Sequence, residues 1–398
     1  MTDPWERFVM RAAGSENAGY FERAAGHSAP KGFAVWFDRG ELLPPIRSPK
    51  DLEQARQRVT RHLRGGRRRC ALGYLGFDAV GLYEPTLRRI AAGSPFPLGE
   101  FLLASEVNES IPQPRASTPE SVVAPVPARP LSDSMSPARF RASVDHLRHA
   151  IREGEAFQVV LAHRRGWPRP NDLLERAGRL RARERFGYFY YLKCGDREVV
   201  GATPESVVEV DGRTAQVNPI AGTLPHRSPG HRLPLLDDAK ELSEHRMLVD
   251  LARNDLGRVA VPGSVRVLWK ERRVRYARLE HLVSRVGARL RRGVGPWGVL
   301  AAAFPAGTVS GAPKIRATAL LRREEGSWRG PYGGTVGLLR SGGRAEWALA
   351  IRSGFAAGPR LYTAAGAGIV HASDPAREYD ETLAKLAMVE STLVAGAR

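Results

Sequence analysis

The stretch GYFYYLKCGDREVVGATPESVVEV, residues 187–210, decides the fold. Ten of its 24 residues are aromatic or β-branched, the types that favour strands. Turn-forming residues divide it into runs typical of strands, at residues 187–194, 198–203 and 205–210. We interpret these runs as strands of an antiparallel sheet.

Helical patterns flank this strand-rich stretch on both sides. Ser136 and Pro137 form an N-cap and first-turn pair, and the apolar residues that follow at helical spacing are Phe140, Val144, Leu147 and Ile151. Further helices are predicted over residues 237–256 and 375–394. Residues 156–165, AFQVVLAHRR, predict a buried strand because they are mostly apolar. Strands and helices follow one another without regular alternation, which predicts an α+β fold.

A Pro- and Ser-rich stretch divides the chain. Residues 110–137 show no apolar periodicity, so we expect a surface linker there. We expect a short N-terminal region before it, residues 1–109, that packs on the core. The larger catalytic domain is expected over residues 138–398.

The composition narrows the class of protein. The formal net charge of +19 favours either nucleic-acid binding or attraction of a small anionic substrate. The arginine clusters lack the interleaved aromatic residues of a single-strand binder, so the small anion is favoured. The two cysteines show no metal-ligand or redox spacing, and no apolar run reaches the roughly 18 residues of a membrane helix. We therefore expect a cytoplasmic protein.

Two pairs of glutamates recur at one helical spacing. Glu241 and Glu244 lie three residues apart in the helix predicted over 237–256, and Glu378 and Glu381 do so in the last helix. That spacing puts both carboxylates of a pair on one helix face. If the two faces meet across a cleft, a divalent cation must offset four negative charges, and oxygen ligands favour magnesium. The alternative is two solvated helix faces, which nearby lysines would also suit.

Small-residue segments and one arginine point to an anion site. PIAGT (219–223), GTVSGAPKIRA (307–317) and AAGAGIV (364–370) could bring backbone N–H groups close to an anionic ligand. Taken singly, each segment is better explained as a tight turn. Arg352 lies in the apolar run WALAIRSGF, which we interpret as a strand, and a carboxylate partner there would offset the cost of burying its charge.

Together these segments resemble the chorismate-binding enzyme family, which includes the first components of anthranilate synthase and aminodeoxychorismate synthase and the isochorismate and salicylate synthases. The resemblance covers residues 136–398 almost without a gap, and before the linker only LGYLGFD matches. The matching segments are GEAFQVVLAHRR, GATPESVVEV, NPIAGTLPHRSPG, KELSEHRMLVDLARNDLGRVAVPGSV, LEHLVSRVGARL, FPAGTVSGAPKIRA, RGPYGGTVG, AIRSGF and AAGAGIVHASDPAREYDETLAK. The resemblance implies a large layered antiparallel β-sheet core flanked by helices.

The resemblance also implies a magnesium ion and its ligands. Glu244 and Glu381 correspond to the closest ligands, and Glu241 and Glu378 hold the ion directly or through water. The ion would bind the ring carboxylate of chorismate and draw electron density from the ring as a nucleophile attacks.

Further site residues follow from the same resemblance. Glu205 corresponds to the general acid that protonates the departing C4 hydroxyl, a role that requires a raised pKa. Arg352 and Tyr332 correspond to the residues that hold the enolpyruvyl carboxylate, and His281 to a histidine beside the ring. The remaining substrate contacts are assigned to Ala221, Gly222, Thr223, Thr308, Gly366, Gly368 and Lys385.

Two positions distinguish members of the family. Members that add water carry a lysine base where this chain has Gln158, and an amide cannot deprotonate water. Members that place nitrogen at C4 typically carry a nucleophilic lysine where this chain has Ala221. The resemblance therefore implies that ammonia enters at C2 with loss of the C4 hydroxyl, and that loss of pyruvate gives anthranilate.

Several alternatives stay open. The enzyme could stop at 2-amino-2-deoxyisochorismate, or could be the first component of an aminodeoxychorismate synthase. Nucleic-acid binding and a catalytically inactive scaffold are the alternatives outside catalysis, and the retained glutamates and Arg352 argue against the scaffold. The sequence shows no glutaminase, so a separate glutaminase subunit or free ammonium would supply ammonia. No segment resembles the LLES-like motif that binds feedback tryptophan, so we expect little inhibition by tryptophan. The pathway and any homo-oligomer stay open.

Overall fold

The computed structural model describes most of the chain, and the described residues are 3–25, 31–88, 93–112, 129–183, 187–225, 239–276 and 279–394. Only the backbone is described at residues 221–225, 239–241, 275–276 and 279–280. Part of the predicted linker, residues 113–128, thus lies outside the described residues. Among the described helices, none combines the length and the apolar character needed to cross a bilayer.

Antiparallel pairing organises the described strands into two ten-stranded sheets. In sheet order, the first consists of β16 (Gly311–Ala312), β8 (Gln158–Pro168), β20 (Arg360–Ile369), β19 (Ser353–Ala357), β10 (Arg197–Thr203), β9 (Tyr188–Cys194), β1 (Asn17–Arg23), β2 (Phe33–Phe37) and β6 (Asn108–Ser110), with β7 (Ser132–Asp133) beside β8. The second consists of β13 (Ile220–Pro225), β15 (Leu279–Arg289), β12 (Thr214–Val217), β11 (Ser206–Asp211), β18 (Arg344–Leu349), β17 (Thr335–Arg340), β4 (Cys70–Leu75), β5 (Gly99–Ala104) and β3 (Glu41–Leu42), with β14 (Arg266–Tyr276) beside β15.

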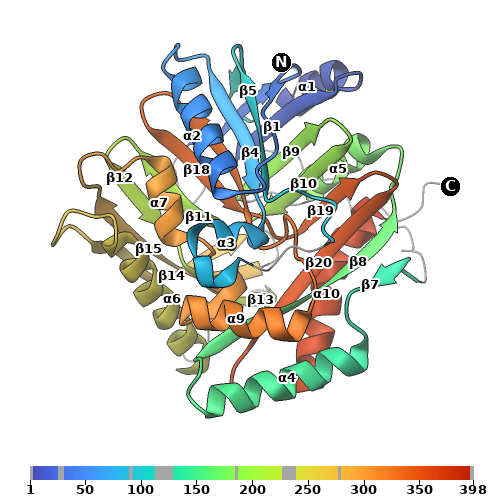
Figure 1. The fold of residues 1–398 in the computed structure, drawn as a ribbon, viewed down its shortest axis with the longest axis vertical. Helices are drawn as coiled ribbons and strands as arrows, with labels where there is room; N and C mark the ends of the chain where they lie inside the picture. Colours follow the sequence, from blue (N-terminus) through green and yellow to red (C-terminus); the bar gives the residue numbers. More distant parts are fainter. Residues whose placement is uncertain are drawn as a thin grey trace.

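Helices cover the outer faces of both sheets, as Figure 1 illustrates. The helices are α1 (Pro4–Ala12), α2 (Pro49–Leu63), α3 (Val80–Tyr83), α4 (Pro137–Arg152), α5 (Leu173–Arg183), α6 (Ala239–Gly257), α7 (Pro296–Ala303), α8 (Gly307–Ser310), α9 (Lys314–Glu325) and α10 (Pro375–Leu393). α1, α5 and α10 pack on the first sheet, and α2, α6 and α7 on the second. The result is the layered α+β fold that the resemblance implied.

Period-2 alternation along the strands builds the core between these layers. On β9, Tyr188, Tyr190 and Leu192 join the apolar cluster between the two sheets. Phe189 and Tyr191, on the opposite face of the strand, pack in the cluster under α1, α5 and α10. Each sheet therefore has two buried faces, which explains why its strands are apolar almost throughout.

The secondary structure predicted around residues 187–210 is confirmed. The predicted strands correspond to β9, β10 and β11, and all their pairings are antiparallel. α4 begins after Ser136, whose hydroxyl accepts the N–H of Arg139, and α10 ends within one residue of its predicted end. The residues before the linker contribute strands to both sheets, β1, β2 and β6 to the first and β3, β4 and β5 to the second. Whether residues 138–398 form a separate domain stays a prediction.

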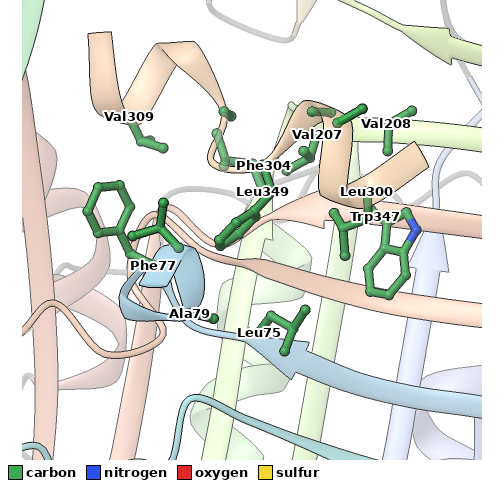
Figure 2. Close-up of a cluster of buried hydrophobic side chains, with 14 of the residues drawn as sticks. Leu75, Phe77, Ala79, Val207, Val208, Leu300, Phe304, Val309, Trp347 and Leu349 are labelled. Atoms are coloured by element: carbon green, nitrogen blue, oxygen red, sulfur yellow. The ribbon is translucent and has the colours of Figure 1, made fainter. Parts of the chain in front are cut away.

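Core packing under α7 gives a direct stability test (Figure 2). Leu300 on α7 is fully buried against β11 and β18. Leu300→Ala is expected to lower the free energy of unfolding by about 2–5 kcal/mol because it leaves a cavity. Urea unfolding followed by circular dichroism measures the change. Leu131→Ala is the control, since Leu131 is 59% exposed and its loss should change stability by less than about 0.5 kcal/mol. Equal shifts in the two variants would contradict this packing.

Candidate active site

Two neighbouring connections pass between the sheets at the same place, and each carries a predicted site residue. Residues 204–205 join β10 of the first sheet to β11 of the second, and residues 350–352 join β18 to β19. The connections are hydrogen-bonded to each other, because the N–H of Leu349 donates to the carbonyl of Glu205 at 3.0 Å. The N–H of Ala202 donates in turn to the carbonyl of Arg352 at 3.3 Å. This crossing fixes the backbones of Glu205 and Arg352 side by side.

Glu205 carries the chemistry expected of a general acid. Burial raises the pKa of its carboxyl to about 7, and the Thr308 hydrogen bond and the Arg352 charge oppose this rise without cancelling it. The hydroxyl of Thr308, on α8, donates to Glu205 Oε1 at 2.6 Å. That contact leaves Oε2 to carry the proton. A carboxyl with this pKa is substantially protonated at neutral pH and can donate a proton there.

Arg352 adopts an uncommon backbone conformation at the crossing. Its φ is +51°, in the left-handed region that non-glycine residues seldom occupy. Such conformations persist where the surrounding structure fixes them, and they gather at functional sites. The neighbouring Ser353 anchors the chain, because its hydroxyl donates to the carbonyl of Ile351 at 2.7 Å and contacts the Tyr190 hydroxyl at 2.6 Å. The sequence indicated a strand at Arg352, whereas the structure places a strained turn there between two strands.

Tyr332 and Lys385 both contact the backbone of Gly366. The N–H of Gly366 donates to the Tyr332 hydroxyl, although burial still raises the pKa of Tyr332 to about 12. Lys385 Nζ donates to the carbonyl of Gly366 at 2.9 Å. A Cβ at Gly366 would lie 2.9 Å from the carbonyl oxygen of Leu161, so the close strand approach requires glycine. Three residues that the sequence assigned to substrate contacts are thus adjacent.

Gln158 lies against a second predicted glycine on the same strand pair. Gln158 begins β8, and a Cβ added at Gly368 on β20 would lie 2.7 Å from its Nε2. Gly368→Ala should therefore displace the Gln158 amide without disturbing backbone, and lower kcat/KM by about tenfold. Steady-state kinetics and a thermal melt measure this together. Gly14→Ala is the control, because a Cβ there meets no atom within 4 Å. Unchanged kcat/KM in Gly368→Ala would show that turnover does not depend on the position of the Gln158 amide.

The predicted carboxylate pairs lie on α6 and α10, which pack on different sheets. Glu244 and Glu378 are partly exposed, Glu381 is exposed, and the side chain of Glu241 lies outside the described residues. Lys385 Nζ lies 2.6 Å from Glu381 Oε1. Among the described side chains, no three His, Cys, Asp or Glu residues gather as a metal site would require. The solvent-accessible carboxylates suit magnesium as donors, but the joint assembly of all four glutamates stays a prediction.

The remaining predicted contacts lie on β13 and β15. His281 on β15 is buried, at 3% exposed, and its backbone pairs with Thr223. Ala221 of β13 pairs with Leu282 of β15. The register of this strand pair shifts between Ala221 and Thr223, and Gly222 lies at that irregularity. The side chains of Ala221 and Thr223 lie outside the described residues.

The structure gives Lys314 a structural partner rather than an anionic ligand. The sequence suggested that residues 307–317 form a helix N-terminus able to hold carboxylate oxygens. Lys314 does begin α9, but its Nζ donates to Asp255 Oδ2 at 2.9 Å and to the carbonyl of Ala303 at 2.8 Å. The ammonium therefore ties the end of α6 to the start of α9, and the residue of this segment that contacts another predicted site residue is Thr308, which donates to Glu205.

Comparison with known proteins identifies the family of the chain. The family model described as chorismate binding enzyme matches residues 35–391. The chain belongs to the chorismate-binding enzyme family. The matched residues extend well before the linker, so the N-terminal strands β2, β4 and β5 belong to the family's domain as well.

Similar members of this family include several anthranilate synthases. Anthranilate synthase component 1 of Streptomyces coelicolor is 42% identical, over 79% of this chain and 70% of that protein. The Saccharolobus solfataricus protein of the same name is 35% identical, over 81% of this chain and 80% of its own length. The Methanothermobacter thermautotrophicus protein is 42% identical, and the match spans 59% of it.

Solved structures of the family share the fold. The crystal structure of anthranilate synthase component I from Streptococcus pneumoniae aligns with a TM-score of 0.75 at 27% identity, over 95% of this chain and 92% of that one. The menaquinone-specific isochorismate synthase of Escherichia coli also gives a TM-score of 0.75, at 18% identity, over 98% of this chain and 91% of that one. At that identity the second likeness concerns the fold alone.

Proposed function

We propose that this member of the chorismate-binding family is the chorismate-using component of an anthranilate synthase. It aminates chorismate at C2 with loss of the C4 hydroxyl, then eliminates pyruvate to give anthranilate. The observation that carries the proposal is the Glu205 carboxyl, whose pKa of about 7 and contact with Thr308 suit proton donation at neutral pH. The relatives named anthranilate synthase component 1 support the same activity.

Glu205 supplies the proton that the amination step requires. The lone pair of ammonia forms a bond to C2, the two conjugated double bonds of the ring each shift by one position toward C4, and the C4–oxygen bond breaks. Glu205 Oε2 gives its proton to the departing oxygen, which leaves as water, and the new ammonium nitrogen loses a proton. Arg352 and Tyr332 would hold the enolpyruvyl carboxylate, since Arg352 is coupled electrostatically to Glu205 and Tyr332 lies beside Gly366.

The elimination step completes the reaction. C2 loses its proton and the bond between C3 and the enolpyruvyl oxygen breaks as the ring becomes aromatic, and the released enolate takes up a proton on its methylene carbon to give pyruvate. His281, buried on β15 opposite Thr223 of β13, is the histidine proposed to assist this step. The choice of C2 over C4 rests on Ala221, which cannot attack the ring as a lysine would, and the choice of ammonia over water rests on Gln158.

Magnesium is part of the proposal. Glu244 and Glu381, with Glu241 and Glu378, would hold the ion. When bound, the ion would supply positive charge next to the ring carboxylate of chorismate. Lys385 would then exchange its contact with Glu381 for one with the substrate, since its Nζ already reaches Gly366.

Ammonia is proposed to come from a separate glutaminase subunit or from free ammonium. The test supplies the purified chain with chorismate, magnesium and either ammonium or glutamine, and identifies products by mass. Anthranilate and pyruvate with ammonium alone are expected. Turnover with glutamine on the chain alone would contradict the separate glutaminase. Accumulation of 2-amino-2-deoxyisochorismate would show that the enzyme does not eliminate pyruvate. Formation of 4-amino-4-deoxychorismate would refute attack at C2.

A further inference from the structure

Arg329 is a buried charge in the connection between α9 and β17, and no step proposed above uses it. Its side chain is 4% exposed. Nε donates to Glu325 Oε2 at 2.8 Å and Nη2 donates to Glu325 Oε1, so the two side chains form a bidentate pair. The guanidinium lies over the ring of Phe77, with Cζ 4.2 Å from the ring centre. A buried pair of this kind costs desolvation energy unless all its donors are satisfied.

The Arg329–Glu325 pair continues the pairing along one edge of β8. The short strand β16 pairs with β8 only at Gln158 and Val159, so the backbone groups beyond them need other partners. Arg329 Nη2 donates to the carbonyl of Val160 at 2.6 Å. Glu325 Oε1 accepts the N–H of Ala162 at 2.9 Å. The two side chains thus replace a strand at this edge.

The opposite edge of β8 faces the predicted substrate glycines. Val160 pairs with Gly368 on β20, and Ala162 pairs with Gly366. Arg329 and Glu325 therefore hold Val160 and Ala162 at the edge of β8 that faces away from β20. The β20 partners of these two residues are the glycines that lie against Gln158 and Tyr332.

Arg329 also reaches the other segments of the site. Its Nη1 donates to the carbonyl of Val309 at 2.6 Å, and Val309 directly follows Thr308 on α8. Its backbone N–H donates to Asp78 Oδ2 at 3.2 Å, and the N–H of Gly330 does so at 2.7 Å. These contacts anchor the chain two residues before Tyr332. Figure 2 places Phe77, which packs on the guanidinium, and Val309 at the same end of the apolar cluster.

We infer that Arg329 is a positioning residue that fixes the segments carrying Gln158, Thr308 and Tyr332 relative to one another. Its effect on turnover rests on the proposed function. The fork of a guanidinium is needed because a lysine ammonium cannot serve Glu325 and two separate carbonyl oxygens with the same geometry.

The first test compares Arg329→Lys with Arg322→Lys. Arg322 lies on α9 and donates to the carbonyl of Leu87, a residue of none of the three site segments, so it is the control for replacing an arginine with lysine. Arg329→Lys is expected to lower kcat at saturating chorismate by about 10–100-fold, with a smaller change in KM, because the bound substrate is held against misplaced groups. Arg322→Lys should keep kcat within about twofold. A folded Arg329→Lys enzyme with wild-type kcat would overturn the inference.

Hydrogen–deuterium exchange provides a readout independent of activity. In Arg329→Lys, peptides covering residues 156–163, 305–312 and 328–333 should gain exchange together, and in Arg322→Lys they should not. A gain confined to 328–333 would overturn the inference. If Arg329→Lys does not fold, Glu325→Gln is used, which keeps an acceptor for Ala162 and should give the same coupled gain in smaller measure. A wild-type chain without activity on chorismate would refute the proposed function, while the exchange result would still decide the positioning role.

Discussion

Replacing Glu205 with glutamine is expected to lower kcat by about 10²–10⁴-fold at pH 7, the usual contribution of a positioned general acid. Glutamine keeps the shape and can still accept the hydrogen bond that Thr308 donates to Oε1. It has no proton to give the departing hydroxyl, so binding of chorismate should survive while turnover fails. Steady-state assay of anthranilate, with a binding titration of chorismate, separates the two quantities.

The pH dependence of the wild-type enzyme should report the same group. The pKa of Glu205 is about 7, so the protonated, active fraction falls as the pH rises through 7. With the concentration of uncharged ammonia held constant, kcat should decline above pH 7 and approach a tenfold loss per pH unit. The control is Glu175→Gln, a change at an exposed position on α5, which should retain the wild-type rate and profile. A Glu205→Gln enzyme with normal kcat would remove Glu205 from the mechanism.

Replacing Glu244 with alanine is expected to abolish turnover while leaving the fold intact. Glu241 and Glu244 are like charges three residues apart on α6, so removing one of the two carboxylates should not destabilise the helix. Wild-type enzyme stripped with EDTA should lose activity in parallel and regain it with added magnesium. Magnesium should also raise the thermal unfolding midpoint of the wild type and not that of Glu244→Ala, because the ion stabilises the folded state only if it binds to it.

Asp250→Ala on the same helix is the matched control for Glu244→Ala. Asp250 is exposed and pairs only with Arg253 among the contacts described for it, one helical turn along. Its removal should leave activity and the response to magnesium unchanged. Full activity in EDTA, or in Glu244→Ala, would mean that the carboxylates on α6 and α10 do not hold a catalytic ion.

Local signals predicted the elements around residues 187–210 well. β9, β10 and β11 are joined by short turns, and α4 and α10 carry their own caps and apolar stripes, so each follows from neighbouring residues. The N-terminal strands could not be placed in this way. β1 pairs with β9 and β4 with β17, partners more than 150 residues away whose register depends on the finished sheets. α2 was missed although its start is marked by Ser48, which caps the N–H of Asp51, and by Pro49.

The identities of the site residues came from the resemblance, but their arrangement did not. Neither the hydrogen bond from Thr308 to Glu205 nor the turn at Arg352 has a local signal, since both depend on two chain crossings between sheets. Arg329 stood inside a matching segment, RGPYGGTVG, with no sign of a role. Its function as a substitute strand is visible only where β16 ends and leaves Val160 without a backbone partner on that edge of β8.

The pairing of N-terminal strands with both sheets also limits which fragments of this chain can be prepared. β1 covers the edge of β9 and β4 covers the edge of β17, and the side chains of β9 and β17 are almost all buried. A fragment beginning at residue 129 would leave backbone N–H and C=O groups unpaired at both edges, beside exposed apolar side chains, the arrangement that recruits strands from other molecules. We expect such a fragment to aggregate, so the candidate site residues should not be separable from the strands that precede them.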